Sequence, residues 1–180
     1  MTVDRDTFRR LRSAFPTGVT VITTVAGDGE PRGLTLQAFV AVSTEPPLIL
    51  VSLEANSRTL VAIRDHGAFV VNFLSEGREQ LSNRFASKEE DKFAGVNWRA
   101  SHVAKGSPIL TADVVAYAEC HVAREIDGGD HQLFLGMVVG GEFLGGRPLM
   151  YYRRTYAAWP EGKVIVPTPA PDAWRDYTDW

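Results

Sequence analysis

The sequence predicts a mainly β protein built around a closed or nearly closed antiparallel barrel. Many short segments rich in β-branched and aromatic residues are separated by turn residues at short spacing, and few segments have helical periodicity. A doubly wound parallel sheet would require strands and helices in regular alternation, which this chain lacks. Its 180 residues suffice for one domain with a substantial core.

The chain begins with a predicted helix over residues 4–14. Phe8 and Leu11 recur there at helical spacing, and Phe15 lies one turn further on. Pro16 follows, and we expect it to end the helix because proline cannot continue the helical hydrogen bonding.

Three β segments are predicted next. Residues 19–25 (VTVITTV) are rich in β-branched side chains, and residues 32–43 resume this composition after a turn at 27–29. The two segments are therefore expected to form a hairpin. After two prolines at 46–47, residues 48–53 (LILVSL) are almost entirely apolar and indicate a buried strand.

A second helix is predicted over residues 58–66. Asn56 or Ser57 can cap its start, and Gly67 occupies the position where left-handed glycines end helices. The remaining predicted elements, in chain order, are a strand over 68–74, a helical segment over 76–85, a polar irregular excursion over 87–107, two long strands over 113–126 and 131–144 joined by a turn at 127–130, and a last strand over 150–159.

We expect residues 1–160 to form the folded domain and residues 161–180 to form an extended tail. The tail contains three prolines, which favour extended backbone. Its aromatic side chains Trp174, Tyr177 and Trp180 are unfavourable to leave in water, so we expect them to pack on the domain or on a second subunit.

Composition excludes several broad classes of protein. The 19 Lys and Arg residues against 22 Asp and Glu residues give a formal net charge of −3, which argues against a nucleic-acid-binding protein. No run of about 18 apolar residues predicts a transmembrane helix. The single cysteine cannot form an intrachain disulfide, and no Cys/His cluster indicates a metal site. Without a secretory leader at its charged start, the chain is expected to be cytoplasmic.

Common catalytic motifs are absent from the sequence. There is no P-loop, no GxGxxG after a strand, and no HExxH, GxSxG or SxxK. These absences disfavour the standard dinucleotide cradle, zinc proteases and serine hydrolases.

Residues 33–39 (GLTLQAF) form the first stretch with potential chemistry. Small and hydroxyl residues interrupt a strand there, beside the planar amide of Gln37. Such donors and acceptors could bond the edge of a flat polar ring. The structural alternative is an ordinary strand with a bulge at Gly33.

Residues 54–59 (EANSRT) form the second stretch, between a buried strand and a helix. Free N–H groups at a helix start attract anions, and hydroxyl and guanidinium groups strengthen the binding of phosphate. The alternative is an ordinary helix cap with a solvated Arg58.

The third stretch is residues 129–131 (GDH), at the mouth of the second predicted hairpin. His131 can titrate near neutral pH, donate a hydrogen bond or stack on an aromatic ring. The alternative is a structural or merely exposed histidine. His66, His102 and His121 have weaker claims to a functional role.

Cys120 is interpreted as a small core residue rather than a nucleophile. In the predicted strand it shares one face with Val114 and Val122, whereas Glu119 and His121 point to the other face. A catalytic pair of Cys120 with His121 is therefore excluded.

Short motifs occur in order between about residue 7 and residue 159. They are 16–19 (PTGV), 33–39 (GLTLQAF), 43–48 (STEPPL), 56–59 (NSRT), 69–74 (FVVNFL), 84–86 (RFA), 91–93 (DKF), 106–108 (GSP), 129–131 (GDH) and 148–156 (PLMYYRRTY). In this order they resemble the flavin reductase family, whose members include the reductase components of two-component flavin monooxygenases. The resemblance implies an antiparallel split β-barrel of Greek-key type, the FMN-binding split barrel, with a few flanking helices.

The resemblance also implies a homodimer that binds FMN or FAD between barrel strands and the partner subunit, with NADH or NADPH as hydride donor. The positions carried over are Thr35, Leu36, Gln37 and Ala38 for the isoalloxazine or ribityl chain; Ser52, Asn56, Ser57 and Thr59 for the ribityl and phosphate region, with Arg58 supplying charge; Phe73 and Leu74 near the flavin edge; and Arg84 as a further phosphate contact. His131 would help to place the nicotinamide.

The implied function is an NAD(P)H-dependent flavin reductase that supplies free reduced flavin to a partner monooxygenase. The cofactors themselves carry out hydride transfer, which agrees with the absence of a visible catalytic dyad. One alternative is a module that retains flavin tightly for electron transfer or sensing, without reductase turnover. Another is an oxygenase that hydroxylates its own substrate, but the chain has no large extra domain to shelter a flavin peroxide.

Overall fold

The computed structural model describes residues 2–158 and confirms a mainly β chain with few helices. The predicted boundary at residue 160 and the tail over 161–180 lie outside the described residues. The helices are α1 (Arg5–Ser13), α2 (Arg58–His66) and α3 (Glu79–Ala86). The strands are β1 (Thr17–Gly18), β2 (Thr20–Val25), β3 (Pro31–Leu36), β4 (Phe39–Thr44), β5 (Pro47–Glu54), β6 (Ala68–Leu74), β7 (Arg99–Ala100), β8 (Pro108–Ile109), β9 (Val114–Gly128), β10 (His131–Phe143), β11 (Leu149–Tyr152) and β12 (Thr155–Ala158).

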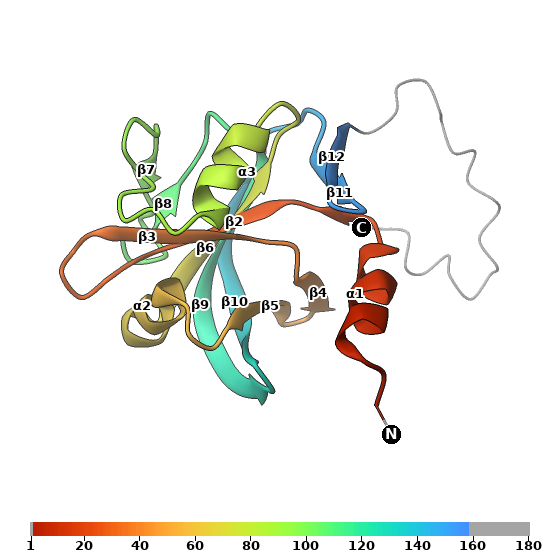
Figure 1. The fold of residues 1–180 in the computed structure, drawn as a ribbon. Helices are drawn as coiled ribbons and strands as arrows, with labels where there is room; N and C mark the ends of the chain where they lie inside the picture. The colour runs from red at the N-terminus through yellow and green to blue at the C-terminus, as the bar shows by residue number, and fades with distance from the viewer. Residues whose placement is uncertain (1, 159–180) are drawn as a thin grey trace, which may run out of the picture.

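Seven strands form one antiparallel sheet in the order β3-β2-β6-β9-β10-β5-β4. Strands β6, β9 and β10 are neighbours in the sheet in that order, and β5, which precedes them in the chain, pairs with β10. This is a Greek-key arrangement. The sheet curls into a barrel (Figure 1). Its edge strands β3 and β4 are consecutive in the chain, but each pairs only with its hairpin partner, so within residues 2–158 the barrel is split rather than closed.

The single β run predicted over residues 32–43 is wrong in one respect. The run is divided after Leu36, and Gln37 and Ala38 carry the chain from one edge of the sheet to the other. Strand β3 pairs with β2, as the predicted hairpin requires, whereas β4 pairs with β5. Both halves have the same β-branched composition, so composition gives no sign that the pairing partner changes.

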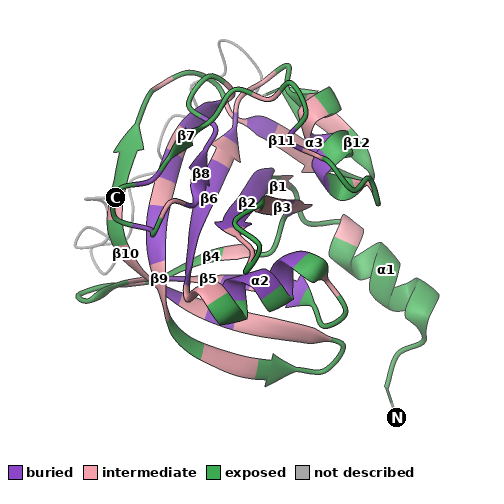
Figure 2. Ribbon diagram, turned by 90° about the vertical axis from the view of Figure 1, so that its left-hand side faces the viewer, coloured by how far each residue is buried: buried purple, intermediate pink, exposed green. Residues whose placement is uncertain are grey.

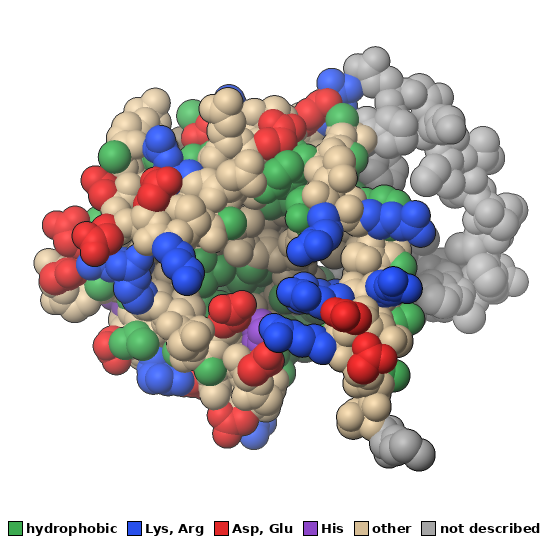
Figure 3. Space-filling view, viewed as in Figure 1, with side chains coloured by type: hydrophobic (Ala, Val, Ile, Leu, Met, Phe, Trp, Pro, Cys, Tyr) green, Lys and Arg blue, Asp and Glu red, His purple; other side chains and the backbone are tan. Residues whose placement is uncertain are grey.

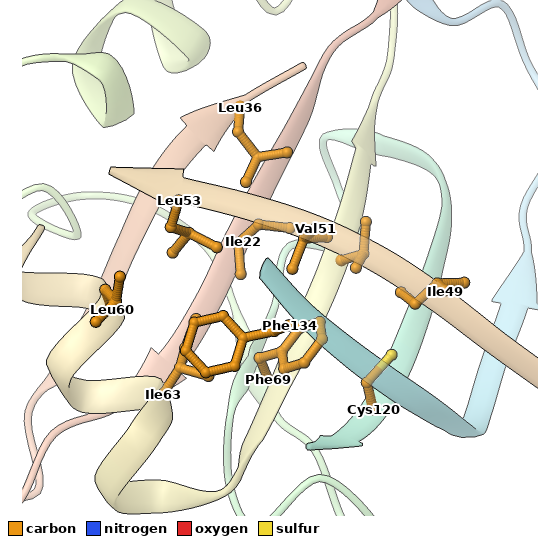
Figure 4. Close-up of a cluster of buried hydrophobic side chains, with 11 residues drawn as sticks. Ile22, Leu36, Ile49, Val51, Leu53, Leu60, Ile63, Phe69, Cys120 and Phe134 are labelled. Atoms are coloured by element: carbon orange, nitrogen blue, oxygen red, sulfur yellow. The ribbon is translucent and has the colours of Figure 1, made fainter. Parts of the chain in front are cut away.

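The main core fills the space between the curled sheet and α2. Leu60 and Ile63 on α2 meet Phe69 on β6 and Phe134 on β10, and all four side chains are buried (Figure 4). Gly67 ends α2 in the left-handed conformation with φ of 70°, and its N–H donates to Ile63 O at 2.8 Å. The predicted helix and its glycine cap are confirmed.

A second core cluster lies between the sheet and α3. Phe85 is fully buried there with Leu74 and Leu149. Gly33 packs directly on Phe85, because a Cβ built on the glycine would lie 2.8 Å from the Cε1 atom of the ring. Strands β2 and β3 pair without a register shift, so the bulge considered at Gly33 is not formed. The glycine permits close approach of the phenylalanine instead.

The excursion predicted over residues 87–107 covers the outer face of the sheet. It contains β7, which pairs with β8, and this small sheet lies against β6 and β9 (Figure 2). Glu119 faces away from the main core, as predicted, but it is buried beneath the excursion and accepts a hydrogen bond from Ser101 Oγ at 2.6 Å. Both faces of this part of β9 are therefore covered.

The C-terminal strand predicted over residues 150–159 is a hairpin, not one strand. Strands β11 and β12 are joined by Arg153 and Arg154, whose φ angles are 48° and 65°. Strand β11 also pairs with β1, which gives a second, three-stranded sheet. The helical segment predicted from residue 76 begins at Glu79, after Gly77 with φ of 80°.

Helix α1 is confirmed but buries no side chain against residues 2–158. The Asp4 side chain caps its start by accepting from the N–H groups of Asp6 and Thr7, both at 2.9 Å. Phe8, Leu11 and Phe15 are 58%, 61% and 73% exposed. The helix stands at the periphery of the barrel in both ribbon views (Figures 1 and 2), so its apolar side chains are not part of the barrel core.

Candidate functional site

Three sequence stretches that were singled out separately meet at one opening of the barrel. Backbone contacts make the connections: Ser52 N donates to Ala38 O at 3.2 Å, and Ala55 N donates to Asp130 O at 3.0 Å. His131 lies opposite Glu54 in the β10–β5 register. The β3–β4 corner, the start of α2 and the tip of the β9–β10 hairpin are therefore neighbours.

The β3–β4 corner presents polar groups at the split in the sheet. Gln37 and Ala38 are exposed, and Thr35 is half-buried. Thr35 Oγ1 donates to Ser82 O on α3 at 2.7 Å, which fixes its side chain. Leu36 instead has a buried side chain in the main core, and its carbonyl oxygen accepts from Thr20 Oγ1 at 2.9 Å.

The start of α2 offers an anion-binding arrangement. Ser57 is the N-cap residue in extended conformation, but its side chain makes no cap hydrogen bond, so the hydroxyl is free for another partner. Asn56 and Arg58 are exposed, whereas Thr59 is buried. N–H groups of a first helical turn point outward toward any bound anion, and the helix dipole favours negative charge there.

The tip of the β9–β10 hairpin carries His131 and Asp130. Their side chains are joined through His131 Nδ1 and Asp130 Oδ1 at 2.7 Å. This hydrogen bond and the charge of the histidine lower the pKa of Asp130, and Arg5 at the start of α1 contributes in the same direction. Because Nδ1 is engaged, Nε2 is the ring nitrogen left for a ligand.

Three further predicted site residues lie in different surroundings. Phe73 on β6 is half-buried and packs edge-to-face on Phe39 of β4, with ring centroids 5.0 Å apart. Leu74 is fully buried in the second core cluster. Arg84 is exposed on α3, and its Nη1 donates to Ala94 O at 2.8 Å.

The sequence motifs do not predict the contribution of α3 and β12 to the corner. The Tyr156 hydroxyl lies 2.9 Å from Ser82 Oγ and 2.7 Å from Asn83 Oδ1, and Ser82 O accepts from Thr35. These contacts join residues 74 and 47 positions apart in the chain. No local pattern signals such a contact, although Tyr156 ends one of the motifs behind the family resemblance.

His121 and the cysteine do not belong to this site. Cys120 is fully buried in the main core, and burial with the nearby charge of Glu119 raises the pKa of its thiol to about 12. His121 Nε2 is bound to Val103 O at 2.7 Å, on the side of the sheet covered by the excursion. The interpretation of Cys120 as a core residue is confirmed.

The barrel opening combines an exposed polar corner, a helix start with a free hydroxyl and a guanidinium, and one histidine. Such a set can hold a flat ring with polar edges and an anionic group, but it contains no nucleophile paired with a base. In the described part of the chain, no three His, Cys, Asp or Glu side chains gather in a way that could hold a metal ion. None of the helices in residues 2–158 is long and apolar enough to cross a membrane.

Residues 11–160 match the family model described as "Flavin reductase like domain". The chain belongs to the flavin reductase family. The antiparallel split barrel and the resemblance drawn from the sequence motifs are both confirmed.

Known flavin reductases are similar to this chain over nearly its whole length. The flavin reductase (NADH) of Kitasatospora aureofaciens is 50% identical over 163 residues, which are 88% of this chain and 83% of that protein. The reductase subunit HsaB of a flavin-dependent monooxygenase from Mycobacterium tuberculosis is 44% identical and covers 97% of this chain and 90% of its own length.

Among solved structures, nitrilotriacetate monooxygenase component B from Mycobacterium thermoresistibile superposes with a TM-score of 0.86 at 43% identity. The match covers 96% of this chain and 93% of that chain. The flavin reductase family thus includes proteins named simply as flavin reductases and proteins named as reductase components of monooxygenases. This chain is an oxidoreductase of that family.

Proposed function

We propose that this chain is an NAD(P)H:flavin oxidoreductase that supplies free reduced FMN or FAD to a partner flavin-dependent monooxygenase. The observation that carries the proposal is the meeting of the corner, the α2 start and the hairpin tip at one barrel opening. Similar proteins are named as NADH- and NADPH-dependent flavin reductases and as monooxygenase reductase subunits. We also propose a cytoplasmic location, which the use of NADH or NADPH as hydride donor supports.

The flavin ring is proposed to lie at the β3–β4 corner. Gln37 and Ala38 offer exposed polar groups and backbone there, and Ser52 is held next to Ala38 by a backbone hydrogen bond. Thr35 lies on the same corner, and half-buried Phe73 lies beneath it against Phe39. We propose that these side chains orient the ring, while the buried Leu36 and Leu74 support the strands from the core side.

The flavin phosphate is proposed to bind at the start of α2. Ser57 has an unengaged hydroxyl, and Arg58 contributes a full positive charge beside it. Asn56 and Thr59 flank these two groups. Arg84 is retained as a further proposed contact, with its guanidinium already bonded to Ala94 O. The donor set suits a phosphate because charge-assisted hydrogen bonds to it are about twice as strong as neutral ones.

His131 is proposed to position the nicotinamide. Asp130 holds the Nδ1 side of the ring, so the Nε2 side is directed to a ligand. When both cofactors are bound, the flavin accepts the hydride that the nicotinamide donates. The protein's own task is to hold the two rings in contact, for which no acid–base residue is required.

The exposure of the site supports loose binding of flavin. The corner residues and Arg58 are exposed in the described chain, so a ligand there would keep contact with solvent. A reductase that passes reduced flavin to a separate enzyme must release it in each cycle. We therefore propose that flavin exchanges as a substrate rather than remaining permanently bound.

We further propose that the protein is a homodimer. Helix α1 exposes Phe8, Leu11 and Phe15, and the edge strand β4 exposes Val40 and Val42. Lys and Arg side chains also gather over α1 beside the barrel (Figure 3). A second copy would bury such apolar side chains and would supply a further wall to the open site.

The direct test is oxidation of NADH and of NADPH with FMN and with FAD, followed at the nicotinamide absorbance. We expect a rate that depends on added flavin with at least one of the four pairs. A protein that retains flavin through purification but oxidises neither nucleotide would support the electron-transfer alternative and contradict the reductase.

A further inference from the structure

Lys92 is a positively charged residue to which the proposed function gives no role. It lies in the loop after α3 and is half-buried. Its Nζ donates to Phe85 O at 2.8 Å and lies 3.4 Å from Gly33 O, the latter at the long end of hydrogen-bond distances. An ammonium group has three donors, so these carbonyls leave at least one for another acceptor.

Arg58 is held on the same loop as Lys92. Its Nη2 lies 3.2 Å from Glu89 O and 3.5 Å from Lys88 O. Both acceptors are main-chain carbonyls rather than carboxylates, so they orient the guanidinium without neutralising it. The loop and the start of α2 are thereby connected through Arg58.

The two cations influence one another. Burial lowers the pKa of Lys92, the nearby charge of Arg58 lowers it further, and Glu89 opposes these effects. The positive charges of Lys92 and Arg58 repel each other, and an anion bound near both would offset this repulsion.

We propose that Lys92 and Arg58 together bind the flavin phosphate, which makes Lys92 a further flavin-binding residue. This inference rests on the proposed function and deepens it, since it names the second cation of the phosphate site. The phosphate carries nearly two negative charges near neutral pH, enough to compensate both side chains. Ser57, with its unengaged hydroxyl, lies next to Arg58 at the same helix start.

Lys92 also stabilises the end of α3 through Phe85 O, so its replacement can act on the fold alone. A comparison of FMN with riboflavin separates the two roles, because these ligands differ only in the phosphate. A structural defect changes both affinities, whereas loss of a phosphate contact changes only that for FMN.

The experiment measures dissociation constants of FMN and riboflavin by fluorescence quenching for the wild type, Lys92→Met and Lys92→Arg. We expect Lys92→Met to raise the FMN constant about 10- to 100-fold, the scale for a lost hydrogen bond between charged groups. The riboflavin constant should stay within about twofold, and Lys92→Arg should retain most of the FMN affinity. Lys88→Met, which removes an exposed charge from the same loop, is the matched control and should change neither constant.

Equal weakening of FMN and riboflavin, or an unchanged FMN constant in Lys92→Met, would overturn the inference. If Lys92→Met does not fold, Lys92→Gln takes its place, since the amide can still donate to the carbonyls but carries no charge. Failure of the proposed function looks different: the wild type itself would bind neither flavin and would show no flavin-dependent nucleotide oxidation.

Discussion

At the scale of single residues, the structure separates side chains with an unengaged polar group from those that build the core. His131 and Ser57 each have a polar group that residues 2–158 leave unused, the Nε2 nitrogen and the hydroxyl. Leu36 adjoins Gln37 in one motif and Leu74 adjoins Phe73 in another, yet both leucines are buried. The motifs therefore contain both residues with free polar groups and the core residues that hold them in place.

Replacing His131 tests the nucleotide side of the site. We expect His131→Ala to raise the KM for NADH or NADPH about 10-fold, because one hydrogen bond or ring contact worth roughly 1–1.5 kcal/mol is lost. The flavin dissociation constant should not change. Steady-state kinetics and a flavin titration on the same variant measure the two effects. The reverse pattern, weaker flavin with an unchanged nucleotide KM, would contradict the assignment.

Cys120 gives a pH-dependent test of the core. Burial raises the pKa of its thiol to about 12, so the reactive thiolate is scarce at pH 8 and increases only as the pH rises toward that value. We expect iodoacetamide to label the native protein very slowly at pH 8 and to label it stoichiometrically in urea. As the chain has one cysteine, mass spectrometry reads the result directly. Rapid labelling of the native protein would show that the thiol is accessible.

A residue's role could be predicted from the sequence where it depends on near neighbours in the chain. The glycine cap at Gly67 and the core position of Cys120 follow from local spacing. The partners of Thr35 and Lys92 do not, because Ser82 and Gly33 are 47 and 59 positions away. Packing between distant elements creates those contacts, and a single sequence does not show which distant elements pack together.

At the scale of elements, Gly33 shows how a motif residue acts through packing. A Cβ at this position would lie 2.8 Å from the Phe85 ring and 3.1 Å from Ile22 O. We expect Gly33→Ala to destabilise the fold by about 1–3 kcal/mol through overpacking between β3 and α3. Gly27→Ala is the matched control, since nothing lies within 4 Å of its built Cβ. Urea unfolding of both variants measures the difference, and equal midpoints would contradict the packing role.

Element boundaries were predictable where composition changes and not where it stays constant. The strand over 68–74 and the helix over 58–66 agree with the observed bounds, since turn or cap residues flank them. The run over 32–43 contains two strands on opposite edges of the sheet, and nothing in its composition marks the division. Residues 87–107 read as polar and irregular, although they cover a third, smaller core cluster.

At the scale of the whole molecule, the split in the barrel determines where the candidate site lies. The edge strands β3 and β4 are joined by two exposed residues, so the opening has a short polar corner at its rim. The α2 start and the β9–β10 hairpin reach the same rim through backbone hydrogen bonds. The sequence motifs indicated the corner, the α2 start and the hairpin tip separately, but only the curled sheet shows that these three segments are neighbours.

A substitution on the exposed apolar face of α1 tests the proposed dimer. We expect the wild type to elute in light-scattering chromatography at about twice the 19.8 kDa chain mass. Leu11→Asp should shift it toward the monomer, since burial of a charge opposes association. Val103→Asp changes an exposed valine on the covering excursion and should leave the mass unchanged. A wild type that is monomeric at micromolar concentration would contradict the proposed dimer.

The central claim is that the corner, the α2 start and the hairpin tip form one flavin site. A crystal structure of the protein soaked with FMN tests it most directly. The account predicts density for the ring against residues 35–38 and for the phosphate at residues 56–59, with His131 beside the exposed ring face. A flavin bound away from this opening, or none at a concentration that saturates the reductase activity, would contradict it.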